Sequence, residues 1–160
     1  MSAGTPILNR LFPERADHTY RGSKLALWFF ALLVLVKTAI SLGSIFNGYT
    51  AASSADGIPL DSFSPAGAQT VLSLFALLGV SQLVICLVCI LVLVRYRALI
   101  PLMFALLLLY QLSRQLILRF LPIPRTGTPP GSAINLVLLG VMIVGLALSL
   151  RSQDNRQAQE

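Results

Sequence analysis

Apolar residues occupy long, nearly unbroken blocks of this chain, and polar residues gather in the short segments between them. Four blocks are almost wholly apolar: 25–46, 68–94, 98–120 and 133–150. Each is close to the ~20 residues with which a helix crosses the hydrocarbon core of a bilayer. The pattern predicts an all-α fold: an integral membrane four-helix transmembrane bundle with antiparallel neighbours and short loops.

Composition supports the same fold class. Of the 160 residues, 56% are hydrophobic and only 11% are charged, whereas soluble domains carry roughly a quarter charged residues. We therefore expect a single four-span domain over 25–150, preceded by a segment at 1–24 and followed by a tail at 151–160. Residues 5–15 have the spacing of a short interfacial helix, and a disordered tail is the alternative.

The distribution of basic residues predicts the orientation of the bundle. Four spans place both termini and the turn at 95–97 on one side, which then holds eight basic residues. These are Arg10, Arg15, Arg21, Lys24, Arg95, Arg97, Arg151 and Arg156. The opposite side has Arg114, Arg119 and Arg125. Because cytoplasmic loops carry the excess of Lys and Arg, we predict cytoplasmic termini in a bacterial inner membrane, with anionic lipid head groups at the basic face.

The connections predict how the helices meet. The turn at 95–97 is so short that the second and third helices should form an antiparallel hairpin and pack side by side. The connection at 121–131 contains four prolines and two glycines, so it cannot continue a helix. In the connection at 47–67, Asp56 is followed by Gly57, which is typical of a tight turn.

Polar residues on the predicted outer side form the candidate site. The cluster consists of Lys37, Asp56, Asp61, Gln111, Arg114, Gln115 and Arg119. The last four recur at helical spacing and make one polar stripe on the third helix. We expect the 47–67 connection to dock over the bundle, with its aspartates paired to Lys37, Arg114 or Arg119. Hydrogen bonds from Gln82 and Asn135 would complete the network.

Lys37 is the most unusual member of this cluster. It follows Lys24 by thirteen residues, which is ~20 Å along a helix and a little beyond the bilayer centre. A charge there costs several kcal/mol unless it is paired or reaches water. A paired Lys37 would lie beside an aspartate, and a snorkelling one would point outward along its own helix. The set is then either a structural network or an outward-facing cationic pocket at Lys37 and Arg114, used for an anionic ligand or for transport.

Cys86 and Cys89 form a C-x-x-C pair in the second apolar run. In a four-helix membrane protein such a pair resembles the quinone-coupled thiol oxidases, which implies a thiol–quinone oxidoreductase as an alternative function. Counted from residue 68, Cys86 lies ~27 Å along the helix, near the reducing cytoplasmic side where disulfides are disfavoured. The sequence has no other cysteine to relay electrons. We therefore interpret both residues as buried, apolar thiols.

Other chemistry-bearing motifs are missing from the sequence. His18 is the single histidine, and no phosphate-binding glycine loop or H-E-x-x-H motif is present. We therefore predict no enzymatic activity, no catalytic, metal or cofactor site, and no nucleic-acid partner for the net charge of +6. The expected role is a structural or accessory membrane component that acts through membrane lipids, other membrane proteins or self-association.

Overall fold

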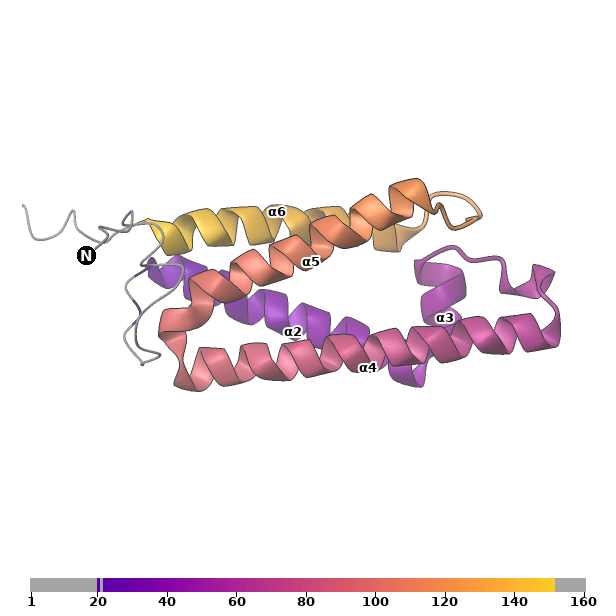
Figure 1. Ribbon diagram of the computed structural model, residues 1–160, viewed down its shortest axis with the longest axis horizontal. Coiled ribbons are helices and arrows are strands. Elements are labelled where there is room, and N and C mark those ends of the chain that lie inside the picture. Colours follow the sequence, from indigo (N-terminus) through magenta and orange to yellow (C-terminus); the bar gives the residue numbers. More distant parts are fainter. Residues whose placement is uncertain (1–19, 21, 152–160) are drawn as a thin grey trace, which may run out of the picture.

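The computed structural model describes Tyr20 and residues 22–151, and within these residues there are helices and connections but no strand. Four long helices dominate (Figure 1): α2 (Lys24–Phe46), α4 (Pro65–Arg95), α5 (Ile100–Phe120) and α6 (Pro130–Leu150). All four are long and apolar enough to cross a membrane. The predicted four-helix fold is thus confirmed, and the chain is a multi-pass membrane protein. The predicted N-terminal interfacial helix and the tail beyond Arg151 lie outside the described residues.

Short helical turns connect the long helices. They are α3 (Gly48–Thr50), the π-helical turn η1 (Ala51–Ala55) and the 3-10 turns η2 (Leu60–Ser62) and η3 (Arg97–Leu99). The first three lie together at one end of the bundle, here termed the capped end and defined by residues 47–64 and 121–129. At the opposite, terminal end, α2 begins, α6 ends and η3 joins α4 to α5 (Figure 1).

Local signals mark where the spans begin. The side chain of Ser23 accepts a hydrogen bond from the backbone N–H of Leu25 at 3.3 Å, and that of Ser64 accepts one from Gly67 at 3.2 Å. Pro65 then opens α4, where its missing N–H has no helical partner to lose. These caps satisfy donors that would otherwise be left unpaired at the helix starts.

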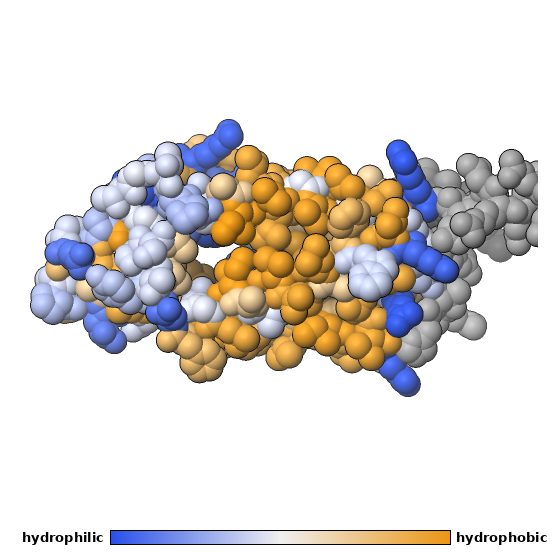
Figure 2. All heavy atoms as spheres, turned by 180° about the vertical axis from the view of Figure 1, so that it is seen from behind, coloured by the Kyte–Doolittle hydropathy of each residue, from blue (hydrophilic) through white to orange (hydrophobic). Residues whose placement is uncertain are grey.

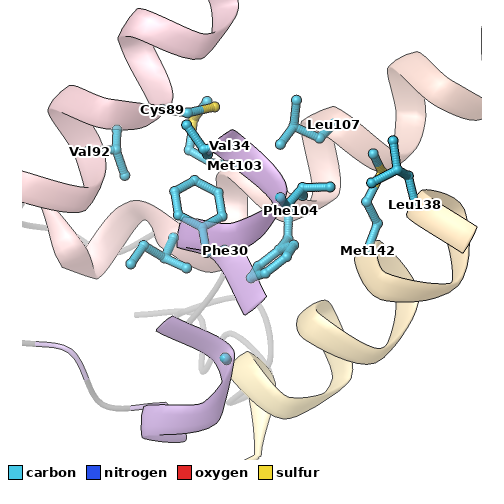
Figure 3. Close-up of a cluster of buried hydrophobic side chains, with 12 residues drawn as sticks. Phe30, Val34, Cys89, Val92, Met103, Phe104, Leu107, Leu138 and Met142 are labelled. Atoms are coloured by element: carbon cyan, nitrogen blue, oxygen red, sulfur yellow. The ribbon is translucent and has the colours of Figure 1, made fainter. Parts of the chain in front are cut away.

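The terminal half of the bundle is tightly packed. Phe30 of α2 and Phe104 of α5 meet edge to face, with ring centroids 5.1 Å apart and an interplanar angle of 69° (Figure 3). Phe104 fits against α6 because residue 145 is glycine, where an added Cβ would lie 2.5 Å from the ring. All four helices contribute to this core, whose further members include Cys89, Val92, Leu138 and Met142.

The helices do not pack in the order in which they follow one another in the chain. α2 packs most extensively against α4 and also against α6, and α5 packs against α6, whereas α4 and α5 make few contacts. α4 and α5 do form an antiparallel hairpin, but their predicted side-by-side packing is wrong beyond the turn. Because Phe104 and Gly145 hold α5 against α6, α5 diverges from α4 toward the capped end (Figure 1).

A glycine allows the closest approach of α2 and α4. A Cβ at Gly79 would lie 2.9 Å from the Ile45 side chain and 3.0 Å from the carbonyl oxygen of Ser41. Small residues at such crossings let backbones approach, which favours association in a lipid solvent that is itself apolar. The α2–α4 pair is therefore closely packed in the capped half as well.

Apolar side chains cover the outside of the bundle between its ends. Figure 2 shows this hydrophobic band, flanked on both sides by hydrophilic residues. Trp28 is 76% exposed and Leu77 is 63% exposed, as expected for side chains that face lipid. At the terminal end the band is bordered by exposed basic residues, namely Lys24, Arg95, Arg97 and Arg151.

The first turns of α4 support the capped end. α4 has 31 residues, well beyond the ~20 that a span needs. Val71, Leu72 and Phe75 in these turns pack against a second buried cluster, formed by Ala52, Ile58 and Leu60. The hydrophilic cap therefore has a small apolar core of its own, beside the start of α4 (Figures 1 and 2).

Candidate functional site

At the capped end, the 47–64 segment docks onto α5 and the 121–129 connection through Asp56 and Gly57. Asp56 Oδ2 lies 3.9 Å from Nη2 of Arg114. The Gly57 carbonyl accepts hydrogen bonds from the N–H and the hydroxyl of Thr126, at 2.8 Å and 3.2 Å. Gly57 has φ +72, a left-handed conformation that glycine adopts without strain. The predicted docking and the pairing of one aspartate with Arg114 are therefore present.

Asn135 of α6 links two donors from α5. Its Oδ1 accepts a hydrogen bond from Arg114 Nη1 at 3.3 Å and one from Gln111 Nε2 at 3.4 Å. Gln111 is only 1% exposed, and its Oε1 has no hydrogen-bond partner. A buried acceptor without a donor costs about 1–3 kcal/mol. The network thus connects α5 to α6 and leaves one buried acceptor open.

A pocket of about 350 Å³ opens beside this network. Its lining residues come from the last turns of α5, the 121–129 connection and the start of α6: Arg114, Gln115, Leu118, Arg125, Ser132, Ala133, Asn135 and Leu136. Among the described residues, Arg125 has no ion-pair partner. With Asp56 facing only Arg114, the pocket carries an excess of positive charge. Polar and apolar groups share its wall, as in many ligand sites.

Lys37 lies apart from this pocket, in the interior of the bundle. Its side chain is 6% exposed, and among the described residues it has no side-chain hydrogen bond or ion pair. Its electrostatic neighbours are Cys86 and Cys89 of α4 and Arg114 of α5. Both predicted alternatives are therefore wrong, since Lys37 neither pairs with an aspartate nor snorkels to the surface. Its side chain is instead buried in the bundle, on the helix that packs most extensively against α4.

Cys86 and Cys89 are electrostatic neighbours of Lys37. This proximity was not predicted from the sequence. Both are free and buried, at 2% and 1% exposure, and Gln82 Nε2 lies 3.7 Å from the sulfur of Cys86. Cys86 precedes Arg95, the last residue of α4, by nine residues, which is ~14 Å along the helix, and Cys89 belongs to the core of the terminal half. That this end of α4 faces the cytoplasm stays a prediction.

The remaining members of the predicted cluster lie elsewhere. Asp61 is exposed and accepts a hydrogen bond from the Tyr49 hydroxyl at 2.9 Å. This bond, together with the carboxylate charge, raises the pKa of Tyr49. Arg119 is exposed in the last turn of α5 and does not line the pocket. In its place the pocket includes Arg125, whose position in the proline-rich connection gave no periodic signal.

The described residues contain no group of three or more His, Cys, Asp or Glu side chains that could hold a metal ion. Comparison with protein-family models, curated proteins and solved structures finds no match to this chain. The function is therefore argued from two features: the cationic pocket at the capped end and the buried, unpaired Lys37.

Proposed function

We propose that this chain is a non-enzymatic accessory membrane protein that holds the anionic head group of a lipid in its capped-end pocket. The observation that carries the proposal is the pair of guanidinium groups, from Arg114 and Arg125, that line one cavity. Asp56 faces Arg114 at 3.9 Å, and Arg125 has no such partner among the described residues. Guanidinium groups suit phosphate because their fork of donors matches its oxygens.

The composition of the pocket wall favours a lipid over a free anion. Leu118, Ala133 and Leu136 line the same cavity as the two arginines, and Leu136 is 66% exposed on the outer surface of α6. A lipid would lay its acyl chains along these apolar side chains and its phosphate against the arginines. A free phosphate would use only the arginines, so the two ligands can be separated by experiment.

The proposal includes an orientation and a location. With cytoplasmic termini in a bacterial inner membrane, the exposed basic residues of the terminal end meet anionic head groups of the cytoplasmic leaflet. The capped end then faces the opposite side. A cysteine introduced at Ser62, which is exposed in the cap, should react with a membrane-impermeant maleimide on intact spheroplasts. A cysteine at Arg97, exposed at the terminal end, should react only after lysis, and the reverse pattern would invert the proposed orientation.

A role without catalysis is supported by the state of the thiols. Cys86 and Cys89 are both buried, and the sequence offers no further cysteine to exchange with them. If the chain were a thiol–quinone oxidoreductase, adding a quinone to the reduced protein would oxidise the pair. We expect both thiols to remain titratable after denaturation in the presence of quinone.

The lipid proposal is tested with purified protein in nanodiscs of phosphatidylcholine, with or without phosphatidylglycerol. We expect phosphatidylglycerol to raise the unfolding temperature of the wild type and to have little effect on Arg125→Gln. Arg119→Gln is the matched control. It removes the same charge from the same end of the bundle, but Arg119 does not line the pocket.

Each outcome bears on one part of the proposal. Equal responses of Arg125→Gln and the wild type would show that the pocket is not the lipid site. If inorganic phosphate in pure phosphatidylcholine discs reproduces the full stabilisation, the ligand is a free anion and the lipid assignment is wrong. If Arg125→Gln and Arg119→Gln both lose the stabilisation by phosphatidylglycerol, the stabilisation comes from general surface charge and not from the pocket.

A further inference from the structure

We propose that the side of the bundle between α4 and α5 binds a transmembrane helix of another protein, and that this helix carries an Asp or Glu at the depth of Lys37. The inference rests on the proposed accessory role, and it names the kind of protein partner. It concerns the interior of the bundle, whereas the lipid pocket lies at the capped end between α5 and α6.

The first argument is an uncompensated charge. Lys37 is 6% exposed and, among the described residues, has no hydrogen bond or ion pair. An unpaired charge near the bilayer centre is costly, and intramembrane cations are usually paired or functional. The described acids are engaged elsewhere, Asp56 with Arg114 and Asp61 with Tyr49. The described part of the chain therefore leaves a buried cation without an anion, which a partner could supply.

The second argument is access. Lys37 belongs to α2, and its electrostatic neighbours lie on α4 and α5. α4 and α5 make few contacts with each other and diverge toward the capped end (Figure 1). The space-filling view shows an opening through the molecule where the hydrophilic cap meets the apolar band (Figure 2). Lys37 itself is buried, so a helix of another protein would reach it by entering between α4 and α5, where the two helices make few contacts.

The third argument is depth, which favours a protein carboxylate over a lipid phosphate. Lys37 precedes Phe46, the last residue of α2, by nine residues, which is ~14 Å along the helix. The hydrocarbon core is ~30 Å thick, so this position is close to its centre. Lipid phosphates lie outside that core, whereas a side chain on a spanning helix can be placed at any depth.

A second copy of this chain does not provide the missing charge. None of its four spanning helices contains an Asp or Glu, and their charged residues are all basic. A copy docked between α4 and α5 through these helices would leave Lys37 unpaired. The expected occupant is thus a different helix that carries one acid.

The test places a photo-cross-linking phenylalanine analogue at residue 82 of the full chain in its native membrane. Gln82 is half-buried and lies one turn from Cys86, a neighbour of Lys37. We expect irradiation to join it to a transmembrane segment that carries Asp or Glu, identified by peptide mass spectrometry. The control is the same analogue at Val84, which is 55% exposed to lipid and points away from residue 82. Cross-links at residue 82 to lipid alone, to a second copy, or to a segment without an acid would each overturn the proposal.

Substitutions at Lys37 separate pairing from folding. Lys37→Met should lower the residue-82 cross-link about tenfold, the scale of 1–2 kcal/mol for polar contacts in membranes. It should also raise the unfolding temperature of the purified chain, because it removes an unpaired buried charge. Lys37→Arg should retain the cross-link, and Lys24→Met, exposed at the start of α2, should change neither readout. If Lys37→Met lowers the unfolding temperature instead, Lys37 is a structural residue and the inference fails.

The two proposals fail separately. Arg125→Gln should abolish the response to phosphatidylglycerol and leave the residue-82 cross-link unchanged. Lys37→Met should lower the residue-82 cross-link and leave the response to phosphatidylglycerol unchanged. A lost cross-link in Arg125→Gln would mean that both features belong to one site, which contradicts the partner helix as described here.

Discussion

The terminal and capped halves of the bundle contain the same four helices and differ in what lies between them. In the terminal half, Phe30 and Phe104 meet edge to face and Gly145 lets α5 approach α6. In the capped half, α4 and α5 make few contacts, Lys37 is buried without a partner among the described residues, and a hydrogen bond between Gln111 and Asn135 links α5 to α6. The comparison indicates that apolar contacts set the helix positions and that polar residues occupy the half where those contacts are sparse.

The largest expected effect comes from removing the aromatic contact of the terminal half. Phe104→Ala should lower the free energy of unfolding by about 3 kcal/mol or more, because it leaves a cavity where a fully buried ring packs. Equilibrium unfolding in detergent measures it. Phe120→Ala is the control, since Phe120 is 77% exposed and should change stability by under about 0.5 kcal/mol. Equal losses at both positions would remove the distinction between the two halves.

The next effect tests the close approach of α5 and α6. Gly145→Ala should destabilise the protein by about 1–3 kcal/mol, because its Cβ would overlap the Phe104 ring. Gly140→Ala is the matched control on the same helix, since a Cβ there meets nothing within 4 Å. Combining Gly145→Ala with Phe104→Leu should recover part of the loss. An equal effect of both glycine substitutions would point to helix propensity rather than packing.

A substitution at Gln111, in the capped half, should raise the free energy of unfolding rather than lower it. Gln111→Met removes a buried acceptor that has no donor, while Arg114 still donates to Asn135. We expect the isolated protein to gain about 1 kcal/mol of unfolding free energy, measured in the same detergent titration. If the free energy of unfolding falls by a similar amount, the Gln111–Asn135 hydrogen bond stabilises the protein by more than the open acceptor costs. The polar contacts of the capped half would then be stabilising, like the apolar contacts of the terminal half.

The smallest effect concerns the cap. Asp61→Asn should lower the pKa of Tyr49 toward the ordinary tyrosine value, since the carboxylate raises it by accepting the hydroxyl hydrogen bond and by its charge. Difference ultraviolet titration against Tyr49→Phe isolates this residue among the tyrosines. Stability at neutral pH should scarcely change, because the pair is exposed at the surface. An unchanged titration would mean that the bond is absent in solution.

The spans could be predicted from sequence because length and apolarity are local properties of each helix. The pairing of the helices could not, because lipid-facing and core residues are equally apolar. Phe104 is fully buried and Phe120 is 77% exposed, yet both lie in the same apolar run of the sequence. In a lipid solvent the hydrophobic effect does not distinguish the two faces of a helix.

The candidate site was predicted only where charge complementarity decided the outcome. The pairing of Asp56 with Arg114 followed from opposite charges on the same predicted side. The environment of Lys37 depended on how α2 packs against the other helices, which buries its side chain without a partner among the described residues. A tertiary contact of this kind leaves no period or motif in the sequence.

The hydrogen bond between Thr126 and Gly57 joins residues 69 positions apart, and this separation has a consequence for synthesis. Chains emerge from the ribosome N-terminus first, at ~5–20 residues per second. α2 and α4 are therefore complete, with the 47–64 segment between them, before Thr126 has been made. For the first part of that interval Asp56 also has no Arg114 to face. Both contacts of the cap therefore wait for α5 and the connection that follows it, and a nascent chain presents the inner surface of α2 and α4 to the membrane before its own last helices can cover it.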